Sequence, residues 1–448
     1  MTVENSVFSN TVGEKSRGLG LTAAHSTRVR LNPGKTFAIG FGMFAISAAW
    51  ALYNAYVPLK LKDFALPTIL IGLIMAIDNI CALTIQPLFG ILSDSVRTRW
   101  GRRLPFAMFL APICAVALCV VGISKGVAVT VLSVVVYAVL MSMWRAPIVA
   151  LMPDVTPSSL RSKANGIINL MGSIGAVIAL VGGSMLLKRY GMSAAFASGA
   201  IIIVIAIVAL ITMVREPKEY CRESVHAAVR VRPWIRFKEA VMPKLNLNVA
   251  ERRSFMLIML TIFSYTIGIN ALETYFTLYA THDLRMRASA ATGALACYAA
   301  GSIVFAVIAG IIATHLGRKR TMSIGLILAI LAFLPMPWIG NRNIVIPAAL
   351  LFGMVLTLVL VNALPWIAEL GGRAHTGTMT AYYYLATSAG AVISPVMFGA
   401  IQQWTGEYRW IFTYAAVFFI AALVCMPFIQ HGEVHDEVQT MVPTRQAA

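Results

Sequence analysis

The chain has 448 residues, of which 59% are hydrophobic and only 12% are charged, and its formal net charge is +18. A soluble domain carries about 25% charged residues, so this composition excludes an ordinary soluble protein. Apolar runs of about 20 residues, each long enough to cross a bilayer as a helix, recur throughout. A transmembrane barrel would instead need segments of about ten residues with alternating polarity. The sequence therefore predicts an all-α polytopic membrane protein.

The six cysteines give no sign of a metal site or a disulfide framework. They form no C-x-x-C pair, and five of them lie in apolar runs, where cysteine usually serves as a small packing residue. The sequence also lacks a nucleophile–base pair and any metal-ligand spacing. We therefore predict no metal, no cofactor and no enzymatic activity.

Both ends of the chain are polar. Residues 1–35 are rich in Ser, Thr and Asn, and no apolar core precedes Thr36. This pattern is not that of a cleavable signal peptide. We expect cytoplasmic tails at residues 1–35 and 431–448.

Twelve apolar spans lie between these tails, in two sets of six. One interior loop, residues 215–254, is long and carries ten Lys and Arg residues. The prediction is an N-terminal six-helix bundle over 36–214, a cytoplasmic linker over 215–254 and a C-terminal six-helix bundle over 255–430. The expected spans are 36–58, 66–92, 104–124, 128–150, 164–187, 192–214, 255–280, 288–314, 321–340, 344–369, 377–402 and 408–430.

The positions of the basic residues predict the orientation, since short cytoplasmic loops carry an excess of Lys and Arg. The side that would hold both termini carries 26 of the 36 Lys and Arg residues, the other side carries 9, and Arg145 lies inside a span. Both termini are therefore expected in the cytoplasm. We interpret the positive charge as a signal that sets the orientation of the chain and that faces lipid. We therefore expect the bilayer, and no nucleic acid, as its partner. The short loops favour a bacterial cytoplasmic (inner) membrane, and we expect a monomer.

One charged loop occurs once in each half. Residues 90–106 read GILSDSVRTRWGRRLPF, and a shorter version, GIIATHLGRK, begins at Gly310, 220 residues after Gly90. The first copy holds Asp94 and four arginines. A guanidinium pairs a carboxylate at two points, so these arginines could latch a cytoplasmic gate. They could equally anchor the loop to anionic lipid, and both roles stay open.

The first copy of this loop resembles a known family. The major facilitator motif is G-x-x-x-D-[RK]-x-G-R-[RK], but here Asp94 and Gly101 are seven residues apart. This lengthened form, with QPLFG at 86–90 and LPF at 104–106, resembles the sucrose/proton symporters and the wider glycoside–pentoside–hexuronide cation symporters. The resemblance is most specific over 72–106 and weaker over 144–175. It implies the major facilitator fold, two pseudo-symmetric six-helix bundles, and sugar–cation symport.

The chain departs from the family pattern at three positions. Ser95 follows the loop acid where the family usually has Arg or Lys, and Thr314 occupies the acid position of the second copy. Gln86 stands where the melibiose-type branch has an acid, which argues against sodium coupling at that position. The resemblance also implies a gate assembled from Gly90, Asp94, Arg97, Gly101, Arg102, Arg103, Asp154 and Arg161. Asp154 and Glu369, at cytoplasmic helix ends, are expected to pair with loop arginines such as Arg97, Arg161 or Arg373.

Three ionisable residues lie well inside spans: Asp78, Glu273 and Arg145. Intramembrane charges are costly and are functional candidates by default. We predict that Asp78 takes up the coupling proton, with Glu273 as a second proton site or a sugar hydroxyl acceptor. Arg145 would position substrate or act on a coupling acid. The alternatives are a fixed hydrogen-bonded Asp78, a Glu273 at a water-facing helix end, and an Arg145 in a structural ion pair or snorkelling to the interface.

Polar and aromatic residues at helical spacing are candidates for a sugar site. Sugars bind through hydroxyl hydrogen bonds and by stacking on aromatic rings, although such stripes more often serve packing or the membrane interface. A mid-span amide needs a partner, which favours the asparagines. The predicted substrate-binding residues are Trp50, Tyr53, Asn54, Asn79, Gln86, Asn270, Asn362, Trp366 and Tyr383.

Taken together, the sequence predicts a proton-coupled importer of a sucrose- or maltose-like glycoside. A proton-driven exporter of drugs or metabolites on the same fold is one alternative, which the lengthened loop disfavours. A membrane sensor that does not transport is another. Such a sensor usually carries a sizeable soluble domain, for which the central loop is too short.

Overall fold

The computed structural model describes residues 33–156, 161–216, 248–370 and 372–430. Within these ranges the regular elements are all helices, apart from one isolated bridge between Thr98 and Gly101. Twelve of the described helices are long and apolar enough to cross a membrane, as predicted. Residues 1–32 of the predicted N-terminal tail, the predicted C-terminal tail and most of the predicted linker lie outside the described residues. Helix α1 begins within the predicted N-terminal tail, at Pro33.

The first bundle contains six helices connected by short loops. They are α1 (Pro33–Asp63), α2 (Thr68–Ser95), α3 (Leu104–Ile123), α4 (Val127–Val155), α5 (Arg161–Tyr190) and α6 (Met192–Met213). Helix α1 packs against α4, α5 and α6, while α3 packs against α4 and α6.

The second bundle repeats this construction. Its helices are α8 (Val249–His282), α9 (Ala288–Leu316), α10 (Arg318–Phe333), α11 (Arg342–Leu370), α12 (Gly372–Thr405) and α13 (Trp410–Cys425). The short 3-10 helices η3 (Met336–Trp338) and η4 (Met426–Phe428) follow α10 and α13. Helix α8 packs against α12 and α13, and α11 packs against α9, α10 and α12.

Several helices run past the predicted spans into the polar segments. Helix α2 ends at Ser95 and α4 at Val155, so Asp94 and Asp154 lie in last helical turns. Helix α8 begins at Val249, where Asn248 and Glu251 form a reciprocal capping box. Hydropathy detects only the apolar part of a helix, whereas hydrogen bonds and caps let the helix continue into the aqueous layer.

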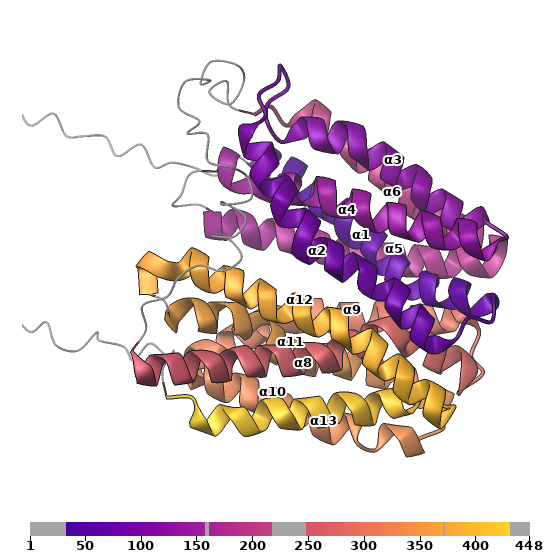
Figure 1. Ribbon diagram of the computed structural model, residues 1–448, viewed down its shortest axis with the longest axis vertical. Coiled ribbons are helices and arrows are strands. Elements are labelled where there is room, and N and C mark those ends of the chain that lie inside the picture. The colour runs from indigo at the N-terminus through magenta and orange to yellow at the C-terminus, as the bar shows by residue number, and fades with distance from the viewer. Residues whose placement is uncertain (1–32, 157–160, 217–247, 371, 431–448) are drawn as a thin grey trace, which may run out of the picture.

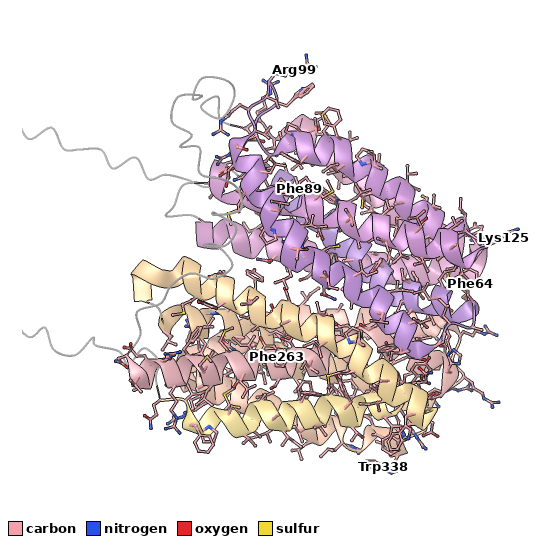
Figure 2. All side chains as sticks on the ribbon, in the orientation of Figure 1. Phe64, Phe89, Arg99, Lys125, Phe263 and Trp338 are labelled. Atoms are coloured by element: carbon pink, nitrogen blue, oxygen red, sulfur yellow. The ribbon has the colours of Figure 1, made fainter. Side chains whose placement is uncertain are left out.

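The two bundles lie side by side with their helices running in similar directions (Figure 1). They meet along three helix pairs, α2 with α12, α5 with α9, and α1 with α8. We call the end of the bundles where α6 ends and α8 begins the linker end, and the end holding the α1–α2 connection the distal end. Arg99 lies at the linker end, and Phe64, Lys125 and Trp338 lie at the distal end (Figure 2).

Candidate functional site

Two acids lie far from the ends of their membrane-spanning helices, one in each bundle. Asp78 of α2 is 3% exposed, and its carboxylate accepts a hydrogen bond of 2.9 Å from the Asn79 amide. Glu273 of α8 is partly exposed. The charges of the two carboxylates interact with each other, so the fold brings these two predicted proton sites together across the boundary between the bundles.

Arg145 of α4 joins the same group. Its guanidinium carbon lies 4.9 Å from the centre of the Trp50 ring, its charge interacts with the Asp78 carboxylate, and Tyr384 of α12 lies near it. Among the described residues, no carboxylate lies within ion-pair distance of Arg145, and its Nε atom has no hydrogen-bond partner. The structure therefore does not show the structural ion pair considered above. We call Trp50, Asp78, Arg145, Glu273 and Tyr384 the central cluster.

Glu273 also borders a small apolar cavity inside the second bundle. The cavity has a volume of about 30 Å³, and its walls come from α8, α9, α10 and α11. Apart from the Glu273 carboxylate and Tyr298, its lining is hydrophobic, with Phe276, Phe333 and Phe352 among the members. The alternative interpretation of Glu273 as a helix-end residue does not hold, because α8 continues for nine residues to His282.

The predicted sugar-site residues divide into two groups. Tyr53, Asn362 and Trp366 are buried in helix packing: Tyr53 stacks on Tyr137 at 5.1 Å, and the Asn362 amide donates to the Leu358 carbonyl oxygen at 2.9 Å. In this conformation their side chains are not accessible to a ligand. The others are partly exposed, namely Trp50, Asn54, Asn79, Gln86, Asn270 and Tyr383.

Sequence reasoning did not single out Tyr384 among the tyrosines of α12. The ring of Tyr383 contacts the ring of Tyr384 at 5.3 Å, and Tyr384 is the tyrosine of this group that lies near Arg145. Three consecutive tyrosines, 382–384, point in different directions around a helix. Only the packing of α12 against the first bundle decides which of them faces Arg145.

At the linker end, the charged residues of the long loop form a compact ion-pair cluster. Arg102 binds Asp154 through two hydrogen bonds of 3.0 and 2.5 Å, and Arg103 binds the same carboxylate at 2.9 Å. Arg103 also pairs with Asp94 and donates to the Gly90 carbonyl oxygen at 3.1 Å. These contacts tie α2, α3 and α4 together within the first bundle. Among the described residues, none of the cluster's partners belongs to the second bundle.

A glutamate that sequence reasoning missed completes this cluster. Glu216, three residues after α6, accepts hydrogen bonds of 2.8 Å from the backbone N–H groups of Arg102, Arg103 and Leu104. Gly101 has a φ of +112°, and a Cβ atom there would collide with the Glu216 carboxylate. Sequence reasoning overlooked Glu216 because it lies at the start of the polar segment that was assigned to the linker. An acid soon after the last apolar residue of α6 was the available signal.

Arg97 and Arg161 were also predicted as gate residues. The Arg97 guanidinium donates to the backbone carbonyl oxygens of Asp94 and Val96 at 2.7 and 2.9 Å, and so it holds its own loop. Arg161 is the first residue of α5, but its side chain lies outside the described part of the structure. The side chains of Glu369 and of residues 372–378, including Arg373, lie outside it as well.

The bundles are joined by hydrogen bonds at the distal end. The Tyr275 hydroxyl of α8 lies 3.2 Å from the Thr68 carbonyl oxygen of α2, to which it donates, and the Thr68 side chain hydrogen-bonds Tyr408 at 3.0 Å. Ser184 of α5 donates to the Ser289 carbonyl oxygen of α9 at 2.7 Å. Between described residues, these are the three hydrogen bonds that connect the bundles, and all three lie at the distal end.

Asp283, the residue directly after α8, is an acid at the distal end. Burial raises the pKa of the Asp283 carboxyl, and hydrogen bonds from the backbone N–H groups of Arg409 and Tyr408 act against that rise. The bond from the Arg409 N–H group is 2.5 Å long. These bonds tie the end of α8 to the segment that precedes α13 within the second bundle.

The chain matches a known family along most of its length. The profile of the Major Facilitator Superfamily matches residues 39–295 and 259–440. The isoprimeverose transporter of Lactiplantibacillus pentosus is 26% identical over 337 residues, which cover 69% of this chain and 65% of that protein. The proton-associated sugar transporter A of Homo sapiens is 39% identical over 69 residues, or 15% of this chain and 9% of that protein. The matched stretches therefore span less than two thirds of either relative.

Solved structures share the fold at low identity. A nucleoside transporter, NupG, superposes with a TM-score of 0.68 at 13% identity, covering 88% of this chain and 99% of that one. An auto-inhibited peptide transporter of the POT family gives 0.69 at 15%, covering 90% and 98%. All four proteins are named as transporters, in agreement with the prediction that the chain is not an enzyme.

Proposed function

Because the chain belongs to the Major Facilitator Superfamily, we propose that it is a secondary active transporter that imports a sugar together with a proton. The observation that carries this proposal is the central cluster. It places one carboxyl from each bundle within electrostatic reach of the other, beside the guanidinium of Arg145. A group that can gain or lose a charge between two mobile halves can couple ion binding to their motion.

The sugar assignment is supported by the relatives and by the residues around the cluster. One relative is named as an isoprimeverose transporter and another as a proton-associated sugar transporter. Partly exposed amides at Asn54, Asn79 and Asn270 would supply hydrogen bonds, and the partly exposed Trp50 ring, which contacts Arg145, would supply an apolar surface. This combination suits the hydroxyl groups and C–H faces of a neutral glycoside such as a disaccharide. Small sets of placed polar groups on an apolar wall are typical of ligand sites.

The arrangement of the bundles is compatible with alternating access. With both termini in the cytoplasm of a bacterial cell, the linker end faces the cytoplasm and the distal end faces outward. The distal hydrogen bonds of Tyr275, Thr68 and Ser184 would then close the outward path. Proton and sugar binding at the central cluster would change the relative stability of this state and an outward-open state. A single copy of the chain holds the whole proposed site.

The test is sugar-induced proton uptake. An unbuffered suspension of cells that express the protein should become alkaline when the transported glycoside is added, and a screen over disaccharides including sucrose and maltose identifies it. A proton-driven exporter takes up one or more protons for each molecule that it sends out. Alkalinisation that accompanies efflux of a preloaded compound, with no response to external glycosides, would therefore replace import by export. The absence of a response to every glycoside would count against sugar symport.

A sugar-accumulation assay examines the role of Asp78. In energised vesicles Asp78→Asn should abolish uphill accumulation, so that internal and external sugar become equal, while exchange and downhill flux continue, because an amide cannot carry a proton. Asp63→Asn is the matched control, since Asp63 is an exposed acid at the distal end of α1. Full accumulation by Asp78→Asn would remove Asp78 from the coupling mechanism.

A further inference from the structure

The connections between equivalent helices of the two bundles differ in length. Helices α2 and α3 are joined by residues 96–103, whereas the corresponding helices α9 and α10 are joined by Gly317 alone. The ion-pair cluster uses Arg102 and Arg103, the last residues before α3. The additional residues of the first connection therefore need an explanation of their own.

These additional residues form an ordered turn. Thr98 and Gly101 exchange two backbone hydrogen bonds of 3.1 Å, and the Thr98 hydroxyl donates to the Gly101 carbonyl oxygen at 2.8 Å. The backbone N–H group of Trp100 donates to the same hydroxyl oxygen at 3.2 Å. The turn holds Arg99 and Trp100 at its tip, where Arg99 stands at the edge of the molecule (Figure 2).

The two tip residues form a unit separate from the ion-pair cluster. The Arg99 guanidinium carbon lies 4.0 Å from the centre of the Trp100 ring. Within the described ranges, Arg99 has no hydrogen bond to a carboxylate and no ion pair, in contrast to Arg102 and Arg103. Its positive charge is exposed and is oriented by the indole ring.

The tip is continuous with an exposed apolar surface of α3. Trp100, which is 37% exposed, meets the ring of Phe109 edge-on at 6.3 Å. Phe109 is 57% exposed, and Ile113 and Val116 continue the exposed apolar stripe along the helix. Tryptophan is enriched where a membrane surface meets water. Trp100 thus lies where the apolar stripe ends, with Arg99 directly beyond it.

We propose that Arg99 and Trp100 bind the headgroup of an anionic phospholipid in the leaflet at the linker end. The guanidinium would contact the phosphate oxygens by charge-assisted hydrogen bonds, and the indole ring would lie among the upper acyl chains and headgroups. A free phosphate ion would meet only one exposed arginine, whereas a lipid adds the apolar contact with Trp100 and Phe109. The site rests on the proposed orientation, in which this leaflet is cytoplasmic.

The experiment is a lipid titration of the purified full chain in detergent, followed by native mass spectrometry. Removing one basic residue near an anionic surface should weaken binding about fivefold, so Arg99→Ala should raise the apparent Kd for phosphatidylglycerol by that factor. Arg99→Lys keeps the charge but loses the planar contact with the ring, and its Kd should lie between the two. Lys125→Ala is the matched control, because it removes an exposed charge at the distal end and should leave the Kd unchanged.

Three outcomes would overturn the site: unchanged phosphatidylglycerol binding by Arg99→Ala, an equal loss of phosphatidylcholine binding, or displacement of the lipid by millimolar inorganic phosphate. A thermal unfolding curve for each variant confirms that its fold is intact. Because the titration requires neither sugar nor a proton gradient, its failure would leave the proposed transport function untouched, and failed symport would leave the lipid site standing.

Discussion

At the scale of single residues, the carboxylate of Glu216 has a role that its position in the sequence conceals. The first N–H groups of a helix have no partner within the helix and carry its positive dipole end. Glu216 accepts three hydrogen bonds from the start of α3, so it caps that helix from the segment that follows α6. It also positions Arg102 and Arg103, whose backbone N–H groups it binds, for their ion pairs with Asp94 and Asp154.

A comparison of two capping glutamates tests this role. Glu216→Gln should lower the free energy of unfolding by about 2 kcal/mol, because an amide loses the charge-assisted bonds and directs an N–H group at other donors. Glu251→Gln should change it by less than about 0.5 kcal/mol, since glutamine serves equally well in a capping box. The measurement is the unfolding midpoint in detergent, followed by circular dichroism. Similar midpoints for the two variants would mean that Glu216 does not stabilise the bundle.

At the scale of helices, the distal contact between α2 and α12 depends on glycine. A Cβ atom on Gly399 would lie 2.9 Å from the Ile69 Cα atom and from the Thr68 carbonyl oxygen. Gly72 faces the Pro395 carbonyl oxygen in the same way. The backbones approach so closely that Tyr275 can reach the Thr68 and Pro395 carbonyl oxygens together. Small residues let membrane helices pack at this distance.

Adding one methyl group should therefore weaken the distal closure. Overpacking costs about 1–3 kcal/mol, so Gly399→Ala should shift the ratio of distal-open to distal-closed molecules by about fivefold or more. Spin labels at positions 125 and 338, which lie at the distal end of different bundles, should report a larger fraction of long distances. Gly182→Ala is the control, because a Cβ atom there meets open space. An unchanged distance distribution for Gly399→Ala would show that this contact does not hold the end closed.

The helices themselves could be predicted, but their contacts could not. Apolar runs fixed the number and order of the spans, because hydrophobic length is a local property of the sequence. The partners of Arg145 and Asp154 are nonlocal. Asp154 proved to bind Arg102 and Arg103, and only the packing of α4 beside α2 and α3 decides this choice among several nearby arginines. Asn362 and Trp366 were predicted to bind a ligand, but both are buried in helix packing. The residue pattern on one face of a helix does not show whether that face lines a cavity or packs against another helix.

At the scale of the whole molecule, the two bundles share a fold but differ in their charged ends. The first bundle has the ion-pair cluster with Asp94 and Asp154. At the equivalent place in the second bundle, the Thr314 hydroxyl donates to the Ile311 carbonyl oxygen of its own helix at 2.7 Å. Control of the proposed cytoplasmic gate should therefore be unequal between the bundles.

This asymmetry predicts different consequences for two substitutions. Asp94→Ala removes a partner of Arg103 and should slow the transport cycle severalfold, while folding and sugar binding are largely retained. Thr314→Ala removes only a bond within one helix and should have little effect. The measurements are initial rates of uptake and equilibrium sugar binding in the same preparation. If the two variants slow uptake equally, the unequal cluster plays no part in the cycle.

The cap on α3 also has a consequence for how the chain is made. A ribosome delivers the residues in order, so α3 enters the membrane long before position 216 has been synthesised. Until then the start of α3 lacks its carboxylate, and Arg102 and Arg103 have only Asp94 and Asp154 to bind. The first bundle thus reaches its final set of contacts only when synthesis has passed α6. A half-length chain produced on its own should be cut after Glu216 rather than at Met213, so that the nascent bundle contains the residue that completes it.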